Sequence, residues 1–192
     1  MLYLLLVLSI YSPILSKSSD TFPDAWYLEQ TPPHLELALS YEGVQRGASE
    51  KDDKIIAEFL NSVGLNKGNP YCAAFVSYVL EKSNIEKPKI RSGLARHFLT
   101  KDSIMATNVR RTNKKIPAGY LVGWQRGNTI FGHLGIVQEW QGNSGRTIEG
   151  NTSPPNIQDA SAQFSGGGVY QKQRSILPGR HFRIVWFTPY EN

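Results

Sequence analysis

The single cysteine of this sequence, Cys72, is the residue best suited to nucleophilic chemistry. It follows Asn69 and Pro70, residue types that are favoured at the N-cap and at the first position of a helix. The sequence therefore predicts that Cys72 lies in the first turn of an apolar helix. Unpaired N–H groups and the positive end of the helix dipole favour a thiolate there, which is the reactive form of a sulfur nucleophile. The alternative is a small buried apolar residue, the usual role of a lone cysteine.

A cysteine nucleophile needs a base that takes its proton and later protonates the leaving amine, and histidine suits both tasks. His133 stands between Gly132 and a run of apolar residues that predicts a buried strand. Glycines at the mouth of a strand leave room for a substrate backbone, so His133 is the predicted base. The other histidines are each explained as surface or packing residues: His34, His97 and His181.

The imidazole in turn needs an acceptor on its far nitrogen. Glu149 and Asn151 lie two residues apart at the end of a predicted strand, so they are expected to share a face and reach one histidine. We rank Glu149 first, because a carboxylate stabilises an imidazolium by charge as well as by a hydrogen bond. The alternative is that both residues belong to a strand end that turns into a loop.

The elements that must position these residues fall into two groups along the chain. Helical periodicity and capping signals come first, and short strand-like runs separated by glycine and asparagine follow. This order predicts an α+β domain with N-terminal helices packed on a C-terminal antiparallel sheet. The basic stretch 101–115 is predicted as a solvated loop, with contact to a polyanion as the alternative. The expected helices span 35–41, 49–63, 70–82 and 93–99, and the expected strands 120–124, 133–140, 146–149, 168–172 and 182–187.

The first residues form an apolar run that is too short to span a bilayer comfortably but suits a signal peptide. We interpret residues 1–18 as a signal peptide, 19–34 as an extended lead-in and 35–192 as one domain. The protein is then secreted or periplasmic; a retained N-terminal anchor is the alternative. Exported chains pair their cysteines, so an unpaired exported thiol is expected to be reactive. The net charge of +5 favours an anionic partner.

Three segments together resemble the motifs of the CHAP family, the cysteine, histidine-dependent amidohydrolases/peptidases: residues 69–77, 132–137 and 148–152. The resemblance extends over about residues 35–187 and implies a papain-like fold. It also implies that Cys72 is the nucleophile, His133 the general base and acid, Glu149 the orienting group and Asn151 a second polar partner. Backbone N–H groups near the start of the Cys72 helix would hold the oxyanion. The sequence lacks the acidic loop with which some members bind calcium, so no metal and no cofactor are predicted. It also has Tyr120 where members usually carry an aspartate.

The resemblance implies an exported cysteine hydrolase that cleaves peptidoglycan, either between muramic acid and L-alanine or within the stem peptide. The expected partner is peptidoglycan or another anionic cell-wall polymer. No nucleic acid and no stable membrane insertion after signal removal are expected, and the protein is expected to be a monomer. The alternatives are a protein-directed deamidase or acyltransferase toxin, and an inactive wall-binding module.

Overall fold

The computed structural model describes residues 31–155, 167–177 and 182–191. The predicted signal peptide, most of the predicted lead-in and His181 lie outside these residues. Within the described ranges no helix is long and apolar enough to cross a membrane. The first helix begins at Pro33, two residues earlier than expected, because a proline fits the first helical position.

Four α-helices and one 3₁₀ helix are described, and the second helix begins and ends as its sequence predicts. The Ser49 side chain caps its first turn by accepting a hydrogen bond from the Asp52 N–H, and Gly64 follows its end with φ +71°. The short helix predicted at 93–99 is the 3₁₀ helix η1. The helices are α1 (Pro33–Leu39), α2 (Glu50–Asn61), α3 (Cys72–Lys82), η1 (Ala95–Phe98) and α4 (Ala106–Thr112).

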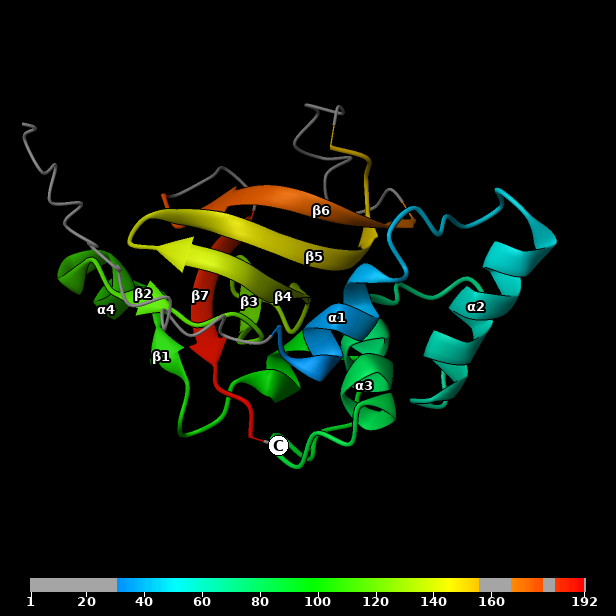
Figure 1. Ribbon diagram of the computed structural model, residues 1–192, viewed down its shortest axis with the longest axis horizontal. Helices are drawn as coiled ribbons and strands as arrows, with labels where there is room; N and C mark the ends of the chain where they lie inside the picture. Colours follow the sequence, from blue (N-terminus) through cyan, green and yellow to red (C-terminus); the bar gives the residue numbers. More distant parts are fainter. Residues whose placement is uncertain (1–30, 156–166, 178–181, 192) are drawn as a thin grey trace, which may run out of the picture. The chain divides into compact units, whose positions relative to one another are not determined.

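Seven strands form one antiparallel sheet in the order β1-β7-β3-β4-β5-β6, with β2 paired to β4 (Figure 1). The predicted α+β class is therefore confirmed, and each predicted strand is present with slightly longer bounds. The strands are β1 (Ile104–Met105), β2 (Lys115–Ile116), β3 (Leu121–Arg126), β4 (Gly132–Gln141), β5 (Ser144–Thr152), β6 (Gly168–Ser175) and β7 (Phe182–Thr188).

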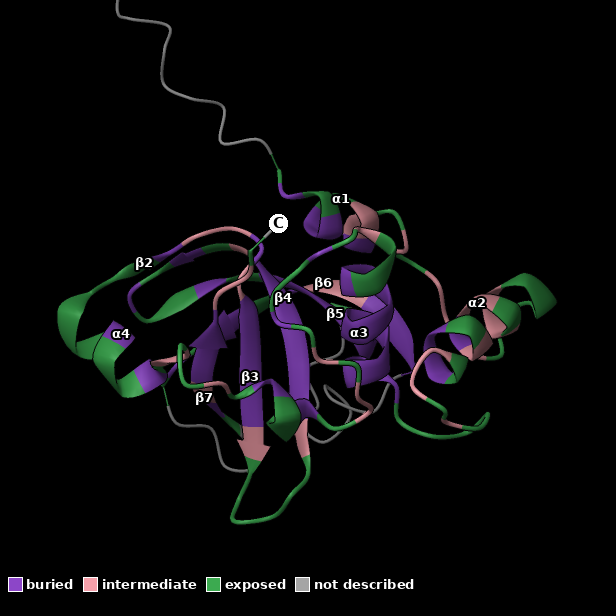
Figure 2. Cartoon of the chain, turned by 90° about the horizontal axis from the view of Figure 1, so that it is seen from below, coloured by how far each residue is buried: buried purple, intermediate pink, exposed green. Residues whose placement is uncertain are grey.

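The central strands are buried on both faces, which explains their continuous apolar runs (Figure 2). Leu121 and Ile136 pack with α1, α2, α3 and η1 in one cluster, whereas their neighbours Val122 and Val137 pack with α4 in another. The helix α3 is buried at every residue from Cys72 to Leu80, as expected of a helix that is apolar all round. It therefore holds Cys72 rigidly against the sheet.

The stretch 101–115 is not the predicted loop. It forms β1, α4 and the start of β2, and it closes the second face of the sheet. Ala106 and Val109 are the buried residues of α4 and lie one turn apart. Two apolar residues among seven are a weak periodic signal, and packing against the sheet supplies the stability that the local sequence lacks.

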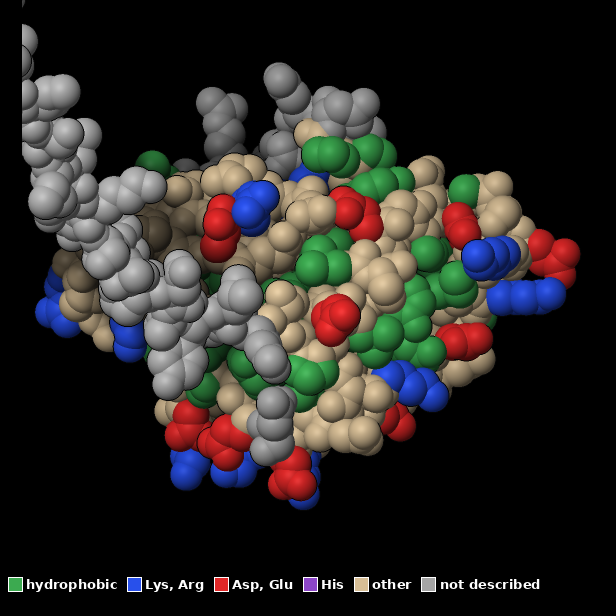
Figure 3. Space-filling view, in the orientation of Figure 1, with side chains coloured by type: hydrophobic (Ala, Val, Ile, Leu, Met, Phe, Trp, Pro, Cys, Tyr) green, Lys and Arg blue, Asp and Glu red, His purple; other side chains and the backbone are tan. Residues whose placement is uncertain are grey.

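The basic net charge is not gathered into one patch on the face seen in Figure 3. Acidic and basic side chains are interspersed there along the edges of the molecule. Attraction to an anionic polymer through this face is therefore expected to be diffuse and sensitive to salt.

Candidate active site

Cys72 is the first residue of α3, so it lies even closer to the helix start than the sequence suggests. The N-cap is Tyr71, not Asn69, and no side chain caps this end. The Asn69 amide instead donates to the Asn66 carbonyl at 3.0 Å, within the preceding loop. Cys72 is 6% exposed, so the thiol is mostly buried rather than freely reachable by solvent.

The loop before Cys72 is fixed by two residues that the sequence did not single out. Arg46 donates hydrogen bonds to the carbonyls of Gly68 (3.1 Å) and Asn69 (2.6 Å), and its guanidinium lies 5.3 Å from the centre of the Tyr71 ring. The Tyr71 hydroxyl donates to the Gly167 carbonyl at 2.7 Å. Together these contacts tie the start of α3 to the start of β6.

His133, the second residue of β4, interacts directly with Cys72. Its Nε2 lies 2.9 Å from Glu149 Oε2, which leaves Nδ1 for the sulfur. A carboxylate only accepts, so Nε2 carries a proton. The Trp124 ring packs edge-on against the imidazole, with ring centres 5.3 Å apart, and limits its rotation.

The two partners shift each other's pKa in opposite directions. Burial raises the pKa of the Cys72 thiol, but the charge and hydrogen bond of His133, with the N–H groups of Leu134 and Ala73, outweigh it and leave the pKa lowered. Burial lowers the pKa of His133, but Cys72 and Glu149 outweigh it and raise the pKa to about 9. At neutral pH the geometry therefore favours a thiolate and imidazolium pair.

Glu149 is fully buried and is held by an arginine that the sequence did not reveal. Arg174, on β6, donates from Nε to Glu149 Oε1 at 2.7 Å and from Nη2 to Oε2 at 2.5 Å. The Thr147 hydroxyl also donates to Oε1 at 2.5 Å. Burial raises the pKa of Glu149, but the charges and hydrogen bonds of Arg174 and His133 outweigh it and hold the pKa well below its usual range. Glu149 is therefore ionised and fixed.

Gly135 makes the contact between Glu149 and His133 possible. It pairs with Glu149 across the two strands and lies two residues after His133, so the three positions share one side of the sheet. A Cβ on Gly135 would lie 2.7 Å from Glu149 Cγ and 3.2 Å from the Ile148 carbonyl oxygen. The absence of a side chain at Gly135 thus leaves the space through which the Glu149 side chain extends to the His133 imidazole.

Asn151 lies at the end of β5, in an irregular part of the strand. Its φ is +56°, and the pairing register with β6 shifts between Glu149 and Thr152. Strict alternation of side chains therefore does not extend from Glu149 to Asn151, and the argument that both share a face does not apply. Asn151 forms a hydrogen bond with Tyr71 through its backbone. A catalytic contribution from Asn151 stays a prediction.

Two of the other histidines lie in contacts unrelated to Cys72. His34 is completely buried and its Nε2 lies 2.8 Å from the Gly119 carbonyl oxygen. His97 is exposed and its Nδ1 lies 2.8 Å from Ser92 Oγ. In the described part of the chain, His133 is thus the histidine that meets both a thiol and a carboxylate.

Comparison with protein families gives an independent result for this region. Residues 64–151 match the family model of the CHAP domain. The match spans less than half of the chain and supports the resemblance to the CHAP family. The family is generally hydrolytic, acting through a cysteine and a histidine as amidohydrolase or peptidase. A comparison with curated proteins finds no match.

The CHAP match ends before β6, so Arg174 lies outside it. Lys172 on the same strand is also buried, and its ammonium donates to the carbonyls of Ser153 (3.0 Å) and Pro154 (3.2 Å). The sequence carries one signal for this pair. Lys172 ends the strand predicted at 168–172, and Arg174 falls on the same face only if that strand continues, as β6 does; two cations on a buried face then need partners inside the protein.

Proposed function

We propose that the protein is an exported CHAP-domain cysteine hydrolase that cleaves an amide bond of peptidoglycan stem peptides. The observation that carries the proposal is the contact of Cys72, His133 and Glu149 inside a matched CHAP domain. A binding module would not need a buried thiol whose pKa is lowered by an imidazolium. The export step rests on the apolar run of residues 2–10, and the attraction to an anionic wall rests on the charge of +5.

The proposed reaction begins with attack of the Cys72 thiolate on the amide carbonyl carbon. The carbonyl electron pair moves to oxygen, and backbone N–H groups at the start of α3 stabilise the resulting oxyanion. When the C–N bond breaks, the His133 imidazolium gives its proton to the leaving amine, and a thioester remains. His133 then takes a proton from water, hydroxide attacks the thioester, and the carboxylic acid and the thiolate are released. Glu149 holds the imidazole in place through both steps.

Digestion of purified peptidoglycan tests the proposal. The wild-type protein is expected to release soluble fragments with new amino termini, whereas Cys72→Ala and His133→Ala release none. Mass spectrometry of the fragments identifies the bond: a new N-terminal L-alanine indicates an amidase, and any other new terminus indicates an endopeptidase. Equal release by wild type and Cys72→Ala would refute the proposal. Folding of the variants is checked by circular dichroism.

A further inference from the structure

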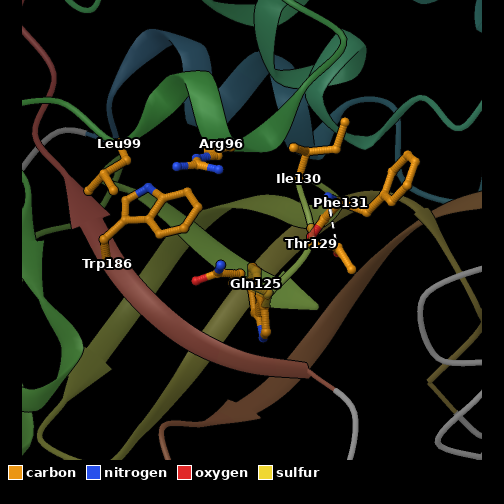
Figure 4. Close-up of a pocket in the computed structure, with 9 residues that line it drawn as sticks. Arg96, Leu99, Gln125, Thr129, Ile130, Phe131 and Trp186 are labelled. Atoms are coloured by element: carbon orange, nitrogen blue, oxygen red, sulfur yellow. Dashed lines mark hydrogen bonds between the residues drawn. The ribbon is translucent and has the colours of Figure 1, made fainter. Parts of the chain in front are cut away.

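A small open pocket of about 90 Å³ lies at the end of β4 that carries His133. Gly132 and Trp124 belong to its wall; Gly132 precedes His133 in β4, and Trp124 both pairs with His133 across the strands and packs on its ring. Figure 4 shows Arg96 and Leu99, from the η1 segment, on one side of the pocket and Ile130 and Phe131, from the β3–β4 turn, on the other. The pocket therefore lies at the same end of β4 as His133, one residue along the strand, while the rings of His133 and Trp124 lie on the other face of the sheet.

The mouth of the pocket is unusually apolar for a solvated surface. Six large apolar side chains are clearly exposed in the described ranges, and three of them line this one pocket: Leu99 (41%), Ile130 (55%) and Phe131 (61%). Scattered exposed apolar residues are normal, but a group of them around a concave site is typical of ligand binding. The β3–β4 turn that carries two of them projects from the sheet (Figure 2).

Both walls are fixed by internal contacts. In η1, Ala95 and Phe98 are buried in the core, so the intervening Arg96 is held on the outer side. In the turn, the Thr129 hydroxyl donates to the Arg126 carbonyl at 2.7 Å and accepts from the Phe131 N–H at 3.2 Å. A ligand therefore meets a formed pocket and does not have to order it.

Arg96 supplies a positive charge that is not used within the protein. Among the described residues no carboxylate and no hydrogen-bond acceptor contacts its guanidinium. The exposed Arg146 on β5, by contrast, contacts the Glu139 carboxylate at 2.7 Å. An arginine at an apolar pocket without such a partner suits a ligand that brings its own carboxylate.

We infer that this pocket is a specificity subsite for a peptide segment that carries a free carboxylate beside an apolar side chain. The carboxylate binds Arg96, and the apolar group packs against Leu99, Ile130 and Phe131. This inference rests on the proposed function, because it takes the segment to be part of the stem peptide that is cleaved. It predicts that the enzyme prefers stem peptides with a free acidic side group over the same peptides in the amidated form.

The test compares two synthetic stem peptides that differ only in one group, a carboxylate or a carboxamide. Wild type is expected to have a kcat/KM about ten-fold higher for the carboxylate, in line with one charge-assisted hydrogen bond at a partly open site. Arg96→Gln should lose this preference through a lower kcat/KM for the carboxylate alone. The matched control is Arg110→Gln on α4, which removes an exposed arginine remote from the pocket and should keep the preference. Phe131→Ser should lower kcat/KM for both peptides equally. Leu177→Ser, which changes an exposed apolar residue outside the pocket, should lower kcat/KM for neither.

Binding to Cys72→Ala, followed by tryptophan emission, separates this inference from the proposed function. If wild type cleaves both peptides with equal kcat/KM, or Arg96→Gln retains the preference, the subsite is refuted and the function stands. If wild type cleaves neither peptide, the proposed function fails. Binding then decides the subsite: tighter binding of the carboxylate form that Arg96→Gln abolishes supports it, and equal binding of the two forms refutes it.

Discussion

Replacing Arg174 by methionine is the sharpest test of how the candidate site is built. The change keeps an unbranched side chain of similar reach but removes both charge-assisted hydrogen bonds to Glu149, at 2.7 and 2.5 Å. Arg174 is 7% exposed and Glu149 is not exposed at all. Methionine therefore leaves a buried carboxylate whose one remaining cationic contact is His133.

Leaving one member of a buried ion pair uncompensated costs about 3–5 kcal/mol. With a urea m-value of about 2 kcal/mol/M, the unfolding midpoint should fall by about 1.5–2.5 M. The matched control is Arg146→Met on β5. Arg146 also donates to a carboxylate at 2.7 Å, that of Glu139, but both side chains are more than half exposed. Loss of such a surface pair should change the free energy of unfolding by less than about 1 kcal/mol.

The dependence on pH separates lost charge from lost packing. In wild type the pKa of Glu149 is lowered, so its contribution to stability is present above the unfolded value of 4.5 and disappears as the pH falls. Without Arg174, His133 alone opposes the effect of burial, so the pKa of Glu149 should rise and the variant should lose less stability than wild type as the pH falls from 7 toward 5. Urea titrations at several pH values measure this slope. The proposed role of Arg174 would be refuted if Arg174→Met lowered the free energy of unfolding no more than Arg146→Met does. It would also be refuted if the stability of Arg174→Met depended on pH as that of wild type does. The double variant Arg174→Met/Glu149→Gln should recover part of the lost stability.

Three further predictions concern the reacting groups. kcat/KM should fall as the pH rises through about 9, because the imidazolium then lacks the proton for the leaving amine; a basic limb near 6.5 in the pH profile would contradict the pairing of His133 with Cys72. Gly135→Ala places a methyl group 2.7 Å from Glu149 Cγ and should displace that side chain. We expect it to lower the free energy of unfolding by about 1–3 kcal/mol, measured by denaturation, and kcat about ten- to a hundred-fold, measured by muropeptide kinetics. Glu149→Gln should lower kcat about ten- to a thousand-fold and Asn151→Ala less; the reverse order on one muropeptide would make Asn151 the orienting residue.

The strands and most helices could be predicted because their signals are local. Ser49 marks the start of α2, and continuous apolar runs mark β3 and β4. The helix α4 could not be predicted, since Ala106 and Val109 are its buried residues and the sheet stabilises it. The start of α3 was placed early because Asn69 and Pro70 have the composition of a cap, while the Arg46 contacts hold the Gly68 and Asn69 carbonyls in a loop.

The triad could be anticipated, but its electrostatics could not. Cys72 and His133 stand at the starts of α3 and β4, and Glu149 lies within β5, three elements whose types the sequence predicts. Arg174 lies 25 residues after Glu149, and only the register of β5 with β6 brings the two strands together. The local sequence pattern does not determine how β5 and β6 are aligned. The sequence therefore does not predict that Arg174 pairs with Glu149.

This partner changes what the carboxylate contributes. A lone glutamate would stabilise the imidazolium by its full negative charge, and this was the reason for ranking it above Asn151. With the Arg174 guanidinium bound to both carboxylate oxygens, thiolate, imidazolium, carboxylate and guanidinium sum to zero in one buried cluster. Charge stabilisation of His133 by Glu149 is then partly offset, and the larger role of the carboxylate is to hold the ring orientation and tautomer. Residues 64–151 contain the proposed reacting groups but not the cation that balances their charge, so the candidate site extends through β6.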